Sequence, residues 1–320
     1  MTGLIGESIS LPEGPAFLDD GSLCVTELAL ERGCVTRIAP DGTRGSVIAK
    51  TGRPNGLALG ADAVLWVAES LVPAILRLEL DGRSAVIATH CGGTPLLWPN
   101  DLCVGPDGRL YVTDSGIRFI DFTQNGELRV DPFTIDLDGR IVAIDPVSGD
   151  GRIIDRGPRF ANGIAFGPDE LLYATETITG NIHRYDLSKA ASRELFGNVL
   201  NSSRPIKGIG GPDGIAFDVN GNLYVAVFGL GEITVLDRSG AVARRIPTRG
   251  QEPTNVAFGP HGSTAIYVTD CEHGCVEVID VHRWARSSPL DGTAVLARCS
   301  LQRSRAAPPR PVLTVFTEPS

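Results

Sequence analysis

Long apolar runs are missing from this sequence of 320 residues. No stretch approaches the roughly 20 consecutive apolar residues that a helix needs to cross a bilayer. The opening stretch, MTGLIGESISLPEGP, also lacks the basic and apolar regions of a secretory signal peptide. We therefore expect a cytoplasmic protein without a membrane partner.

Positive charge is scarce. The chain carries 29 Lys and Arg against 38 Asp and Glu, a formal net charge of -9. Surfaces that bind nucleic acid need clustered Lys and Arg to neutralise phosphates, so this balance argues against a nucleic-acid partner. The expected partner is a small-molecule substrate, and the sequence indicates no oligomeric state.

A framework of paired cysteines is missing too, because the seven cysteines are odd in number and scattered along the chain. A secreted, disulfide-stapled domain needs paired cysteines, so most of these thiols are expected to be reduced and buried. The stretch CEHGC, from Cys271 to Cys275, offers three soft ligands on one short turn and has no partner pair elsewhere. We interpret it as the flanks of a hairpin turn rather than as a zinc site.

Common signals of helical bundles and of nucleophilic catalysis are likewise absent. Methionine occurs once, whereas 38 Gly and 22 Pro favour many short elements joined by tight turns. There is no Gly-x-Ser-x-Gly elbow, and the five histidines fall outside the repeated positions described next. The sequence therefore predicts no nucleophilic serine of this type and no histidine as general base.

The sequence contains six copies of one short phrase. The copies are PEGPAF from Pro12, PNGLAL from Pro54, PNDLCV from Pro99, ANGIAF from Ala161, PDGIAF from Pro212 and PTNVAF from Pro253. Each is followed by a turn and a second segment rich in β-branched and aromatic residues, such as LYVTD, then by a third segment and in most copies a weaker fourth. These features predict four short antiparallel strands per repeat.

The spacing of the copies identifies the architecture. The second residues of the phrases are separated by 42, 45, 62, 51 and 41 residues. A period of about 40 to 50 residues with four strands each predicts an all-β, six-bladed β-propeller. A sandwich or an open array of hairpins is the alternative, but neither explains the sixfold recurrence. We assign residues 1–282 to the propeller, as a single catalytic domain, and residues 283–320 to an irregular tail whose TAVLA and PVLTVF segments are candidates for a ring-closing strand.

The longest interval indicates an insertion at about residues 117–139, between the second and third strands of the third repeat. In an up-and-down blade this loop emerges on the face where the first strand begins, so it is expected to overhang that end of the channel. Long loops of this kind often act as lids. Phe119, Phe122 and Phe133 favour a substrate wall over a simple surface hairpin.

The second positions of the six phrases are predicted to form a ring at one mouth of the central channel. They are Glu13, Asn55, Asn100, Asn162, Asp213 and Thr254. Turn formation is the alternative explanation for Asn55 and Thr254, but Glu13 is a poor turn former. Placing Glu13 and Asp213 on one narrow axis sets two carboxylates against each other, and a cation resolves that conflict.

The ligand types indicate which cation. Carboxylate and amide oxygens without His or Cys suit a hard divalent ion, and calcium, magnesium and manganese fit this set better than zinc. These ligands leave coordination positions open for water and substrate, as a catalytic metal requires.

The motifs resemble the SMP-30/gluconolactonase/luciferin-regenerating family of six-bladed propellers over roughly residues 11–281. The resemblance rests on Glu before GP in the first repeat, PND in the third, NG in the fourth and PDG in the fifth. It implies that Glu13, Asn162 and Asp213 bind a metal ion and that Asn100 completes the shell or orients substrate. It also places Asp101 near the site, and it implies a lactonase, since most members hydrolyse small lactones and some relatives hydrolyse organophosphates.

One position departs from the family pattern. Sugar-lactone members carry Arg two residues before the matched Asn, whereas this chain has Trp98. An aromatic side chain offers stacking and apolar area instead of a charged fork, so a less polar lactone is expected. The alternative is that Trp98 only packs against a neighbouring blade.

The hypothesis for the chemistry is metal-assisted ester hydrolysis, in which the ion polarises the lactone carbonyl and a carboxylate deprotonates the attacking water. Asp213 is the candidate base and Asp101 is its rival, because metal binding suppresses the basicity of a carboxylate. Asn100, Trp98 and Asn55 are the predicted substrate contacts. Three alternatives stay open: a non-enzymatic propeller that binds a protein, a metal-free enzyme of the strictosidine synthase type, and a metal-dependent isomerase or cyclase.

Overall fold

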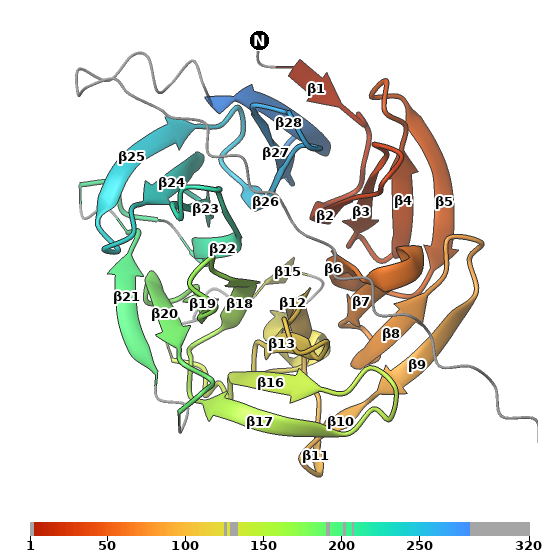
Figure 1. Ribbon diagram of the computed structural model, residues 1–320, viewed down its shortest axis with the longest axis vertical. Helices are drawn as coiled ribbons and strands as arrows, with labels where there is room; N and C mark the ends of the chain where they lie inside the picture. Colours follow the sequence, from red (N-terminus) through yellow and green to blue (C-terminus); the bar gives the residue numbers. More distant parts are fainter. Residues whose placement is uncertain are drawn as a thin grey trace, which may run out of the picture.

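The repeats fold as six four-stranded antiparallel sheets around a central channel, which confirms the predicted six-bladed β-propeller (Figure 1). The computed structural model describes residues 3–124, 127–128, 134–189, 193–200, 203–206 and 208–281. We number the sheets as blades 1 to 6 in the order of the six phrases. Each phrase forms the innermost strand of its blade.

The strands of each blade are given from the channel outward. Blades 1 to 3 consist of β2 (Pro12–Phe17), β3 (Leu23–Glu27), β4 (Cys34–Ile38) and β5 (Arg44–Lys50); β6 (Pro54–Leu59), β7 (Leu65–Glu69), β8 (Ala74–Leu78) and β9 (Ser84–Ala88); and β12 (Pro99–Val104), β13 (Leu110–Asp114), β16 (Arg140–Ile144) and β17 (Gly151–Arg156). Blades 4 to 6 consist of β18 (Ala161–Phe166), β19 (Leu172–Glu176), β20 (Asn181–Tyr185) and β21 (Glu194–Asn198); β22 (Gly211–Phe217), β23 (Leu223–Phe228), β24 (Glu232–Leu236) and β25 (Val242–Pro247); and β26 (Pro253–Phe258), β27 (Ala265–Asp270), β28 (Cys275–Asp280) and β1 (Gly3–Ile5).

In the described part of the chain, four short elements lie in the connections between blade strands. They are the hairpins β10 (His90–Cys91) with β11 (Thr94–Pro95) and β14 (Thr123–Gln124) with β15 (Glu127–Leu128), the 3-10 turn Ala61–Ala63 and the single-turn helix α1 (Phe119–Phe122). Helix α1 and the hairpin β14–β15 lie in the insertion between β13 and β16. No helix among the described residues is both long and apolar enough to cross a membrane.

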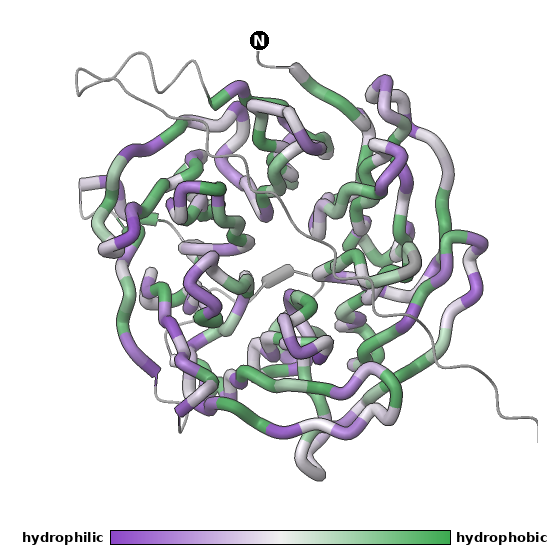
Figure 2. The backbone as a smooth tube through the Cα atoms, in the orientation of Figure 1, coloured by the Kyte–Doolittle hydropathy of each residue, from purple (hydrophilic) through white to green (hydrophobic). Residues whose placement is uncertain are grey.

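The core is divided among the six junctions between neighbouring blades. Blades 1 and 2, for example, bury Cys24 and Val35 against Leu65 and Val67, and equivalent apolar clusters fill the other five junctions. A blade between two others has both faces covered, so its second strand reads as a continuous apolar segment rather than an alternating one. Hydrophobic segments run through all six blades, the outer strands mix hydrophobic and hydrophilic segments, and hydrophilic segments are frequent at the turns (Figure 2).

The pairing of the first strand with the second shifts register within the phrase in every blade, as it does at a β-bulge. In blade 3 the register shifts between Pro99 and Leu102, and the other five first strands also shift within the phrase. A bulge leaves residues out of the ladder and re-aims their side chains. The irregularity recurs in every phrase, and the second position of each phrase lines the cavity at the mouth of the channel.

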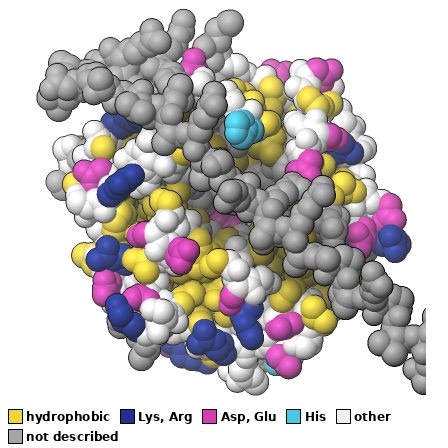
Figure 3. Space-filling model, in the orientation of Figure 1, with side chains coloured by type: hydrophobic (Ala, Val, Ile, Leu, Met, Phe, Trp, Pro, Cys, Tyr) yellow, Lys and Arg dark blue, Asp and Glu magenta, His cyan; other side chains and the backbone are white. Residues whose placement is uncertain are grey.

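The outer position of blade 6 is occupied by β1, which pairs antiparallel with β28 and so joins the start of the chain to its last described strand. The TAVLA and PVLTVF segments, which were the predicted candidates for ring closure, lie outside the described residues. The assignment of residues 1–282 and 283–320 stays a prediction. On the face seen in Figure 3, acidic and basic side chains are interspersed around the rim.

Candidate functional site

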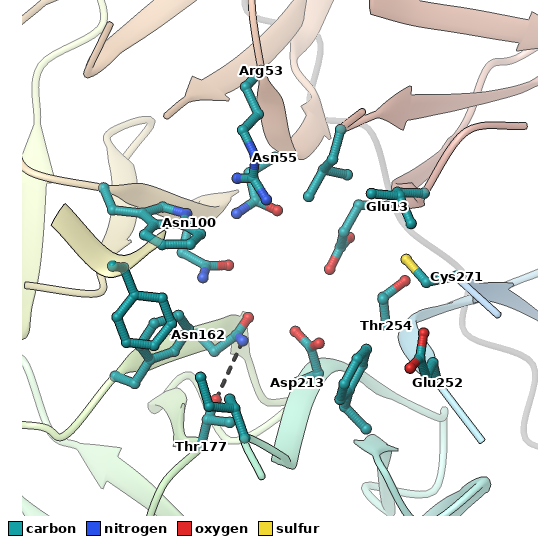
Figure 4. Close-up of a pocket in the computed structure, with 17 residues that line it drawn as sticks. Glu13, Arg53, Asn55, Asn100, Asn162, Thr177, Asp213, Glu252, Thr254 and Cys271 are labelled. Atoms are coloured by element: carbon teal, nitrogen blue, oxygen red, sulfur yellow. Dashed lines mark hydrogen bonds between the residues drawn. The ribbon is translucent and has the colours of Figure 1, made fainter. Parts of the chain in front are cut away.

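One cavity of about 290 Å³ opens at the mouth of the channel where the phrases begin. Its lining includes all six second positions: Glu13, Asn55, Asn100, Asn162, Asp213 and Thr254. Figure 4 shows that the carboxylates of Glu13 and Asp213 and the amides of Asn100 and Asn162 point toward a common centre. Five of the six are buried and Asp213 is half-buried. The propeller thus brings together side chains that are about 40 to 60 residues apart in sequence.

Two hydroxyl groups orient the amides of Asn100 and Asn162. Ser115 Oγ donates its hydrogen to the Ala161 carbonyl at 2.9 Å and accepts from Asn100 Nδ2 at 2.9 Å. Thr177 Oγ1 donates to the Pro212 carbonyl at 2.8 Å and accepts from Asn162 Nδ2 at 3.2 Å. Because each hydroxyl has one hydrogen, which the carbonyl takes, each amide must present its nitrogen to the hydroxyl and its oxygen to the cavity.

Buried carboxylates at the ends of the second strands position the cavity wall. Glu69 Oε1 accepts from the backbone N–H of Arg53 at 2.7 Å, and Asp114 Oδ1 accepts from that of Trp98 at 2.9 Å. Both Arg53 and Trp98 line the cavity. The acids therefore act as structural caps, although their side-chain type alone could suggest a catalytic role.

Asp101 lies outside the cavity lining, one residue further along β12, and is 7% exposed. Asn255 Nδ2 donates to Glu13 Oε2 at 2.9 Å and to Asp101 Oδ2 at 3.5 Å, so one amide joins the two carboxylates. A Cβ atom on Gly56 would lie 2.5 Å from Asp101 Oδ1, and one on Gly214 would lie 2.0 Å from Asn255 Cγ. The third positions of blades 2 and 5 are therefore glycine because side chains from blades 3 and 6 occupy that space.

Sequence reasoning missed Asn255, Ser115 and Thr177. Asn255 had a detectable signal, because it replaces the glycine of the third position just as Asp101 does. Ser115 stands in the segment VTDSG, which is typical of a turn, yet it is fully buried and orients Asn100. Its role depends on the carbonyl of the next blade, which no local pattern shows.

The carboxylates at the channel hold protons more tightly than usual. Burial, reinforced by the charge of Asp101, raises the pKa of Glu13 to about 8. Burial also raises the pKa of Asp101 to about 6. The pKa of Asp213 is raised well above its ordinary value by burial and by the charges of Glu13 and Asp101. These shifts have the direction expected of buried carboxylates that face each other without a cation.

The cavity oxygens suit a hard cation. Within the described part of the chain, neither Glu13 nor Asp213 forms an ion pair, and Asn162 Oδ1 is buried without a hydrogen-bond donor. The described residues contain no group of three or more His, Cys, Asp or Glu arranged to hold a metal ion. A candidate site here is therefore built from two carboxylates, Glu13 and Asp213, and two amides, Asn100 and Asn162.

The insertion forms part of the cavity wall. Phe122 of α1 lines the cavity, and Phe119, Phe122 and Phe160 each make edge contacts with the Trp98 ring at centroid distances of 5.4 to 5.7 Å. Trp98 thus both lines the cavity and packs in an apolar cluster, and its contact with substrate stays a prediction. Phe133 and part of the insertion lie outside the described residues.

The remaining polar candidates are the CEHGC segment and the histidines. The turn between β27 and β28 is the CEHGC segment, and Cys271 in it lines the cavity, which the sequence did not suggest. Burial and nearby acids raise the pKa of the Cys271 thiol well above its usual value, so it is a poor nucleophile. None of the described histidines lines the cavity.

Comparison with known proteins agrees with the geometry. The family model SMP-30/Gluconolactonase/LRE-like region matches residues 11–272. A gluconolactonase of Zymomonas mobilis is 27% identical over 82% of this chain and 76% of its own length. A diisopropyl-fluorophosphatase of Loligo vulgaris is 27% identical over 85% of this chain and 89% of its own.

The solved structure of a gluconolactonase from Xanthomonas campestris has a TM-score of 0.71 at 24% identity and covers 87% of this chain and 88% of its own. This similarity supports the propeller fold, while the family match spans most of the chain and includes all six second positions. The predicted family is confirmed. The chain belongs to the SMP-30/gluconolactonase/LRE-like family.

Proposed function

We propose that this protein is a divalent-metal-dependent hydrolase that opens a small, relatively apolar lactone. The observation that carries the proposal is the convergence of Glu13, Asp213, Asn100 and Asn162 on one cavity, with two carboxylates that lack a cationic partner among the described residues. The names of the relatives, a gluconolactonase and a diisopropyl-fluorophosphatase, support hydrolysis. The apolar wall that includes Trp98 supports a less polar substrate than a sugar lactone.

In this proposal Glu13, Asn162 and Asp213 hold the ion, and Asn100 completes its shell or orients the substrate. Calcium is the first choice, with magnesium, manganese and zinc as alternatives. When bound, the ion would polarise the lactone carbonyl and stabilise the oxyanion. The orphaned oxygen of Asn162 supports this assignment because it is a buried acceptor that a cation would satisfy.

The chain's own groups supply the remaining chemistry. Asp213 lines the cavity and is the proposed general base for water, while Asp101 lies outside the lining and shares the Asn255 amide with Glu13. Asn55 and Trp98 contact substrate in this proposal, and Trp98 with Phe122 and Phe160 excludes water from one side. Isomerisation or cyclisation would use the same residues, and product analysis separates these reactions from hydrolysis.

Adding an ion is expected to raise the melting temperature of chelated protein. A ligand that binds only the native state at about 100 times its Kd contributes about 2.7 kcal/mol, which corresponds to roughly 5 °C for a chain of this size. The measurement is the melting temperature with calcium, magnesium, manganese and zinc in turn, together with metal content of the purified protein. Glu13→Gln should abolish the response, and no shift with any ion would favour the non-enzymatic binding module.

The chelated protein is also expected to lose stability as pH rises from about 5 to about 8. The raised pKa values of Glu13 and Asp101 mean that the folded state keeps protons which the unfolded chain releases at lower pH. Raising the pH therefore stabilises the unfolded state relative to the folded one. Melting curves across this range test the slope, which Glu13→Gln should flatten; a melting temperature that rises with pH in the chelated wild type would contradict the prediction.

A further inference from the structure

Arg53 has no role in the chemistry proposed above. It is the only residue with a positively charged side chain among the described residues that line the cavity. The residue is 8% exposed, and its guanidinium extends into the cavity beside Asn55 (Figure 4). A buried arginine directed into a ligand-sized cavity needs an explanation.

The surroundings of Arg53 hold the guanidinium without neutralising it. The guanidinium carbon lies 4.1 Å from the centroid of the Phe119 ring and 4.9 Å from that of Trp98. Nη1 donates to Ser70 Oγ at 2.9 Å. Within the described residues no carboxylate lies within ion-pair distance of the Arg53 guanidinium. Glu69 is near enough to act on it electrostatically; its Oε1 accepts from backbone N–H groups, and its buried Oε2 has no hydrogen-bond partner in the described part of the chain.

Arg53 keeps its positive charge in this environment. Burial lowers the pKa of Arg53 to about 10, so the side chain stays protonated at neutral pH. A guanidinium has five N–H donors in a planar fork, and only the bond to Ser70 is made by the Arg53 side chain among the described residues. A buried charge with unused donors is costly unless a ligand pairs with it. The two aromatic rings pack against the guanidinium. A guanidinium fork with unused donors can bind a carboxylate through two parallel hydrogen bonds.

We propose that Arg53 anchors a carboxylate carried by the substrate, so that the preferred substrate is an apolar lactone with one carboxylate away from the reacting ring. The inference rests on the proposed lactonase function because both place the substrate in the same cavity. The charges of the lining limit the ligand: Arg53 faces a cavity that also holds Glu13, Asp213 and Glu252. One cation among three acids suits a single negative charge and disfavours a phosphate dianion.

The test uses a matched pair of unreactive probes, 3-phenylpropionate and 3-phenylpropanamide, which differ in charge and little in shape. Calorimetric titration of calcium-supplemented wild type should show tighter binding of the carboxylate by about tenfold or more. Arg53→Gln should reduce that preference about tenfold. Arg53→Lys keeps the positive charge and loses the planar fork, so it should retain part of the carboxylate preference. Partial retention in this variant shows that the loss in Arg53→Gln is not caused by misfolding.

Arg83→Gln is the matched control, since Arg83 is an exposed arginine in the turn between β8 and β9 of the same blade. It should bind both probes like the wild type. The proposal is overturned if wild type shows no carboxylate preference. It is also overturned if Arg53→Gln keeps the full preference, because a bound ion would then be the carboxylate receptor.

Repeating the titration with chelator separates this inference from the proposed function. The probes need no turnover, so an Arg53-dependent preference in chelated protein supports the anchor even where calcium has no effect. Failure of the proposed function would appear instead as an absent ion response in the melting experiment.

Discussion

Asp213→Asn is expected to abolish binding of the divalent ion and to lower kcat/KM for a small lactone by about 10³-fold or more. The substitution keeps the size of the side chain and removes its negative charge. In the proposed mechanism this charge both binds the ion and allows Asp213 to deprotonate the attacking water. The charge conflict with Glu13 also disappears, so the chelated variant should melt at a higher temperature than chelated wild type. Calorimetry with calcium, lactone hydrolysis and melting curves measure the three effects.

Asp237→Asn is the matched control for this experiment. Asp237 lies in the exposed turn between β24 and β25 of the same blade, where Asn can make the same turn contacts. Its ion binding and activity should equal those of the wild type. An Asp213→Asn enzyme with full activity would remove Asp213 from both of its proposed roles.

Thr177→Val is expected to weaken ion binding about 10- to 100-fold. Valine has the shape of threonine but cannot accept from Asn162 Nδ2, so the amide is free to turn its oxygen away from the cavity. The hydrogen bond to the Pro212 carbonyl is lost as well, which should cost about 1 kcal/mol of unfolding free energy. Calcium titration measures the affinity, and thermal unfolding measures the stability.

Thr175→Val separates the two consequences. Thr175 Oγ1 donates to the Asp213 carbonyl at 3.1 Å, so it bonds to the same neighbouring strand without touching Asn162. Its loss should lower stability to a similar extent and leave ion affinity unchanged. Equal affinity losses in the two variants would show that Thr177 acts through blade packing and not through the amide.

The parts of this fold that could be predicted are those that each repeat encodes locally. Strand, turn and strand recur in every copy within a few residues, so blade number and strand order follow from periodicity. The second positions could be placed on one ring because the same phrase recurs in the first strand of all six repeats. Glu13 and Asp213 stood out within the ring because carboxylates that meet on one axis require an explanation.

The contacts made across blades could not be predicted in the same way. Asn255 bonds to Glu13 across 242 residues of sequence, and Ser115 bonds to Ala161 in the next blade. Cys271 and Arg53 enter the cavity from loops whose local sequence resembles ordinary turns. Such contacts depend on the angle at which one blade meets the next, and side-chain packing between blades sets that angle.

The sequence by itself determined the six blades, the ring of oxygen-bearing side chains and the family, because each depends on a pattern repeated or contained within short segments. Only the tertiary structure decided which amide oxygens face the cavity, that Asp101 lies beneath it, and that Trp98 joins the core and the wall. It also left Arg53 buried without an acid to pair with among the described residues. Closing the ring creates these environments, because burial and hydrogen-bond direction arise only when residues from different blades meet around one axis.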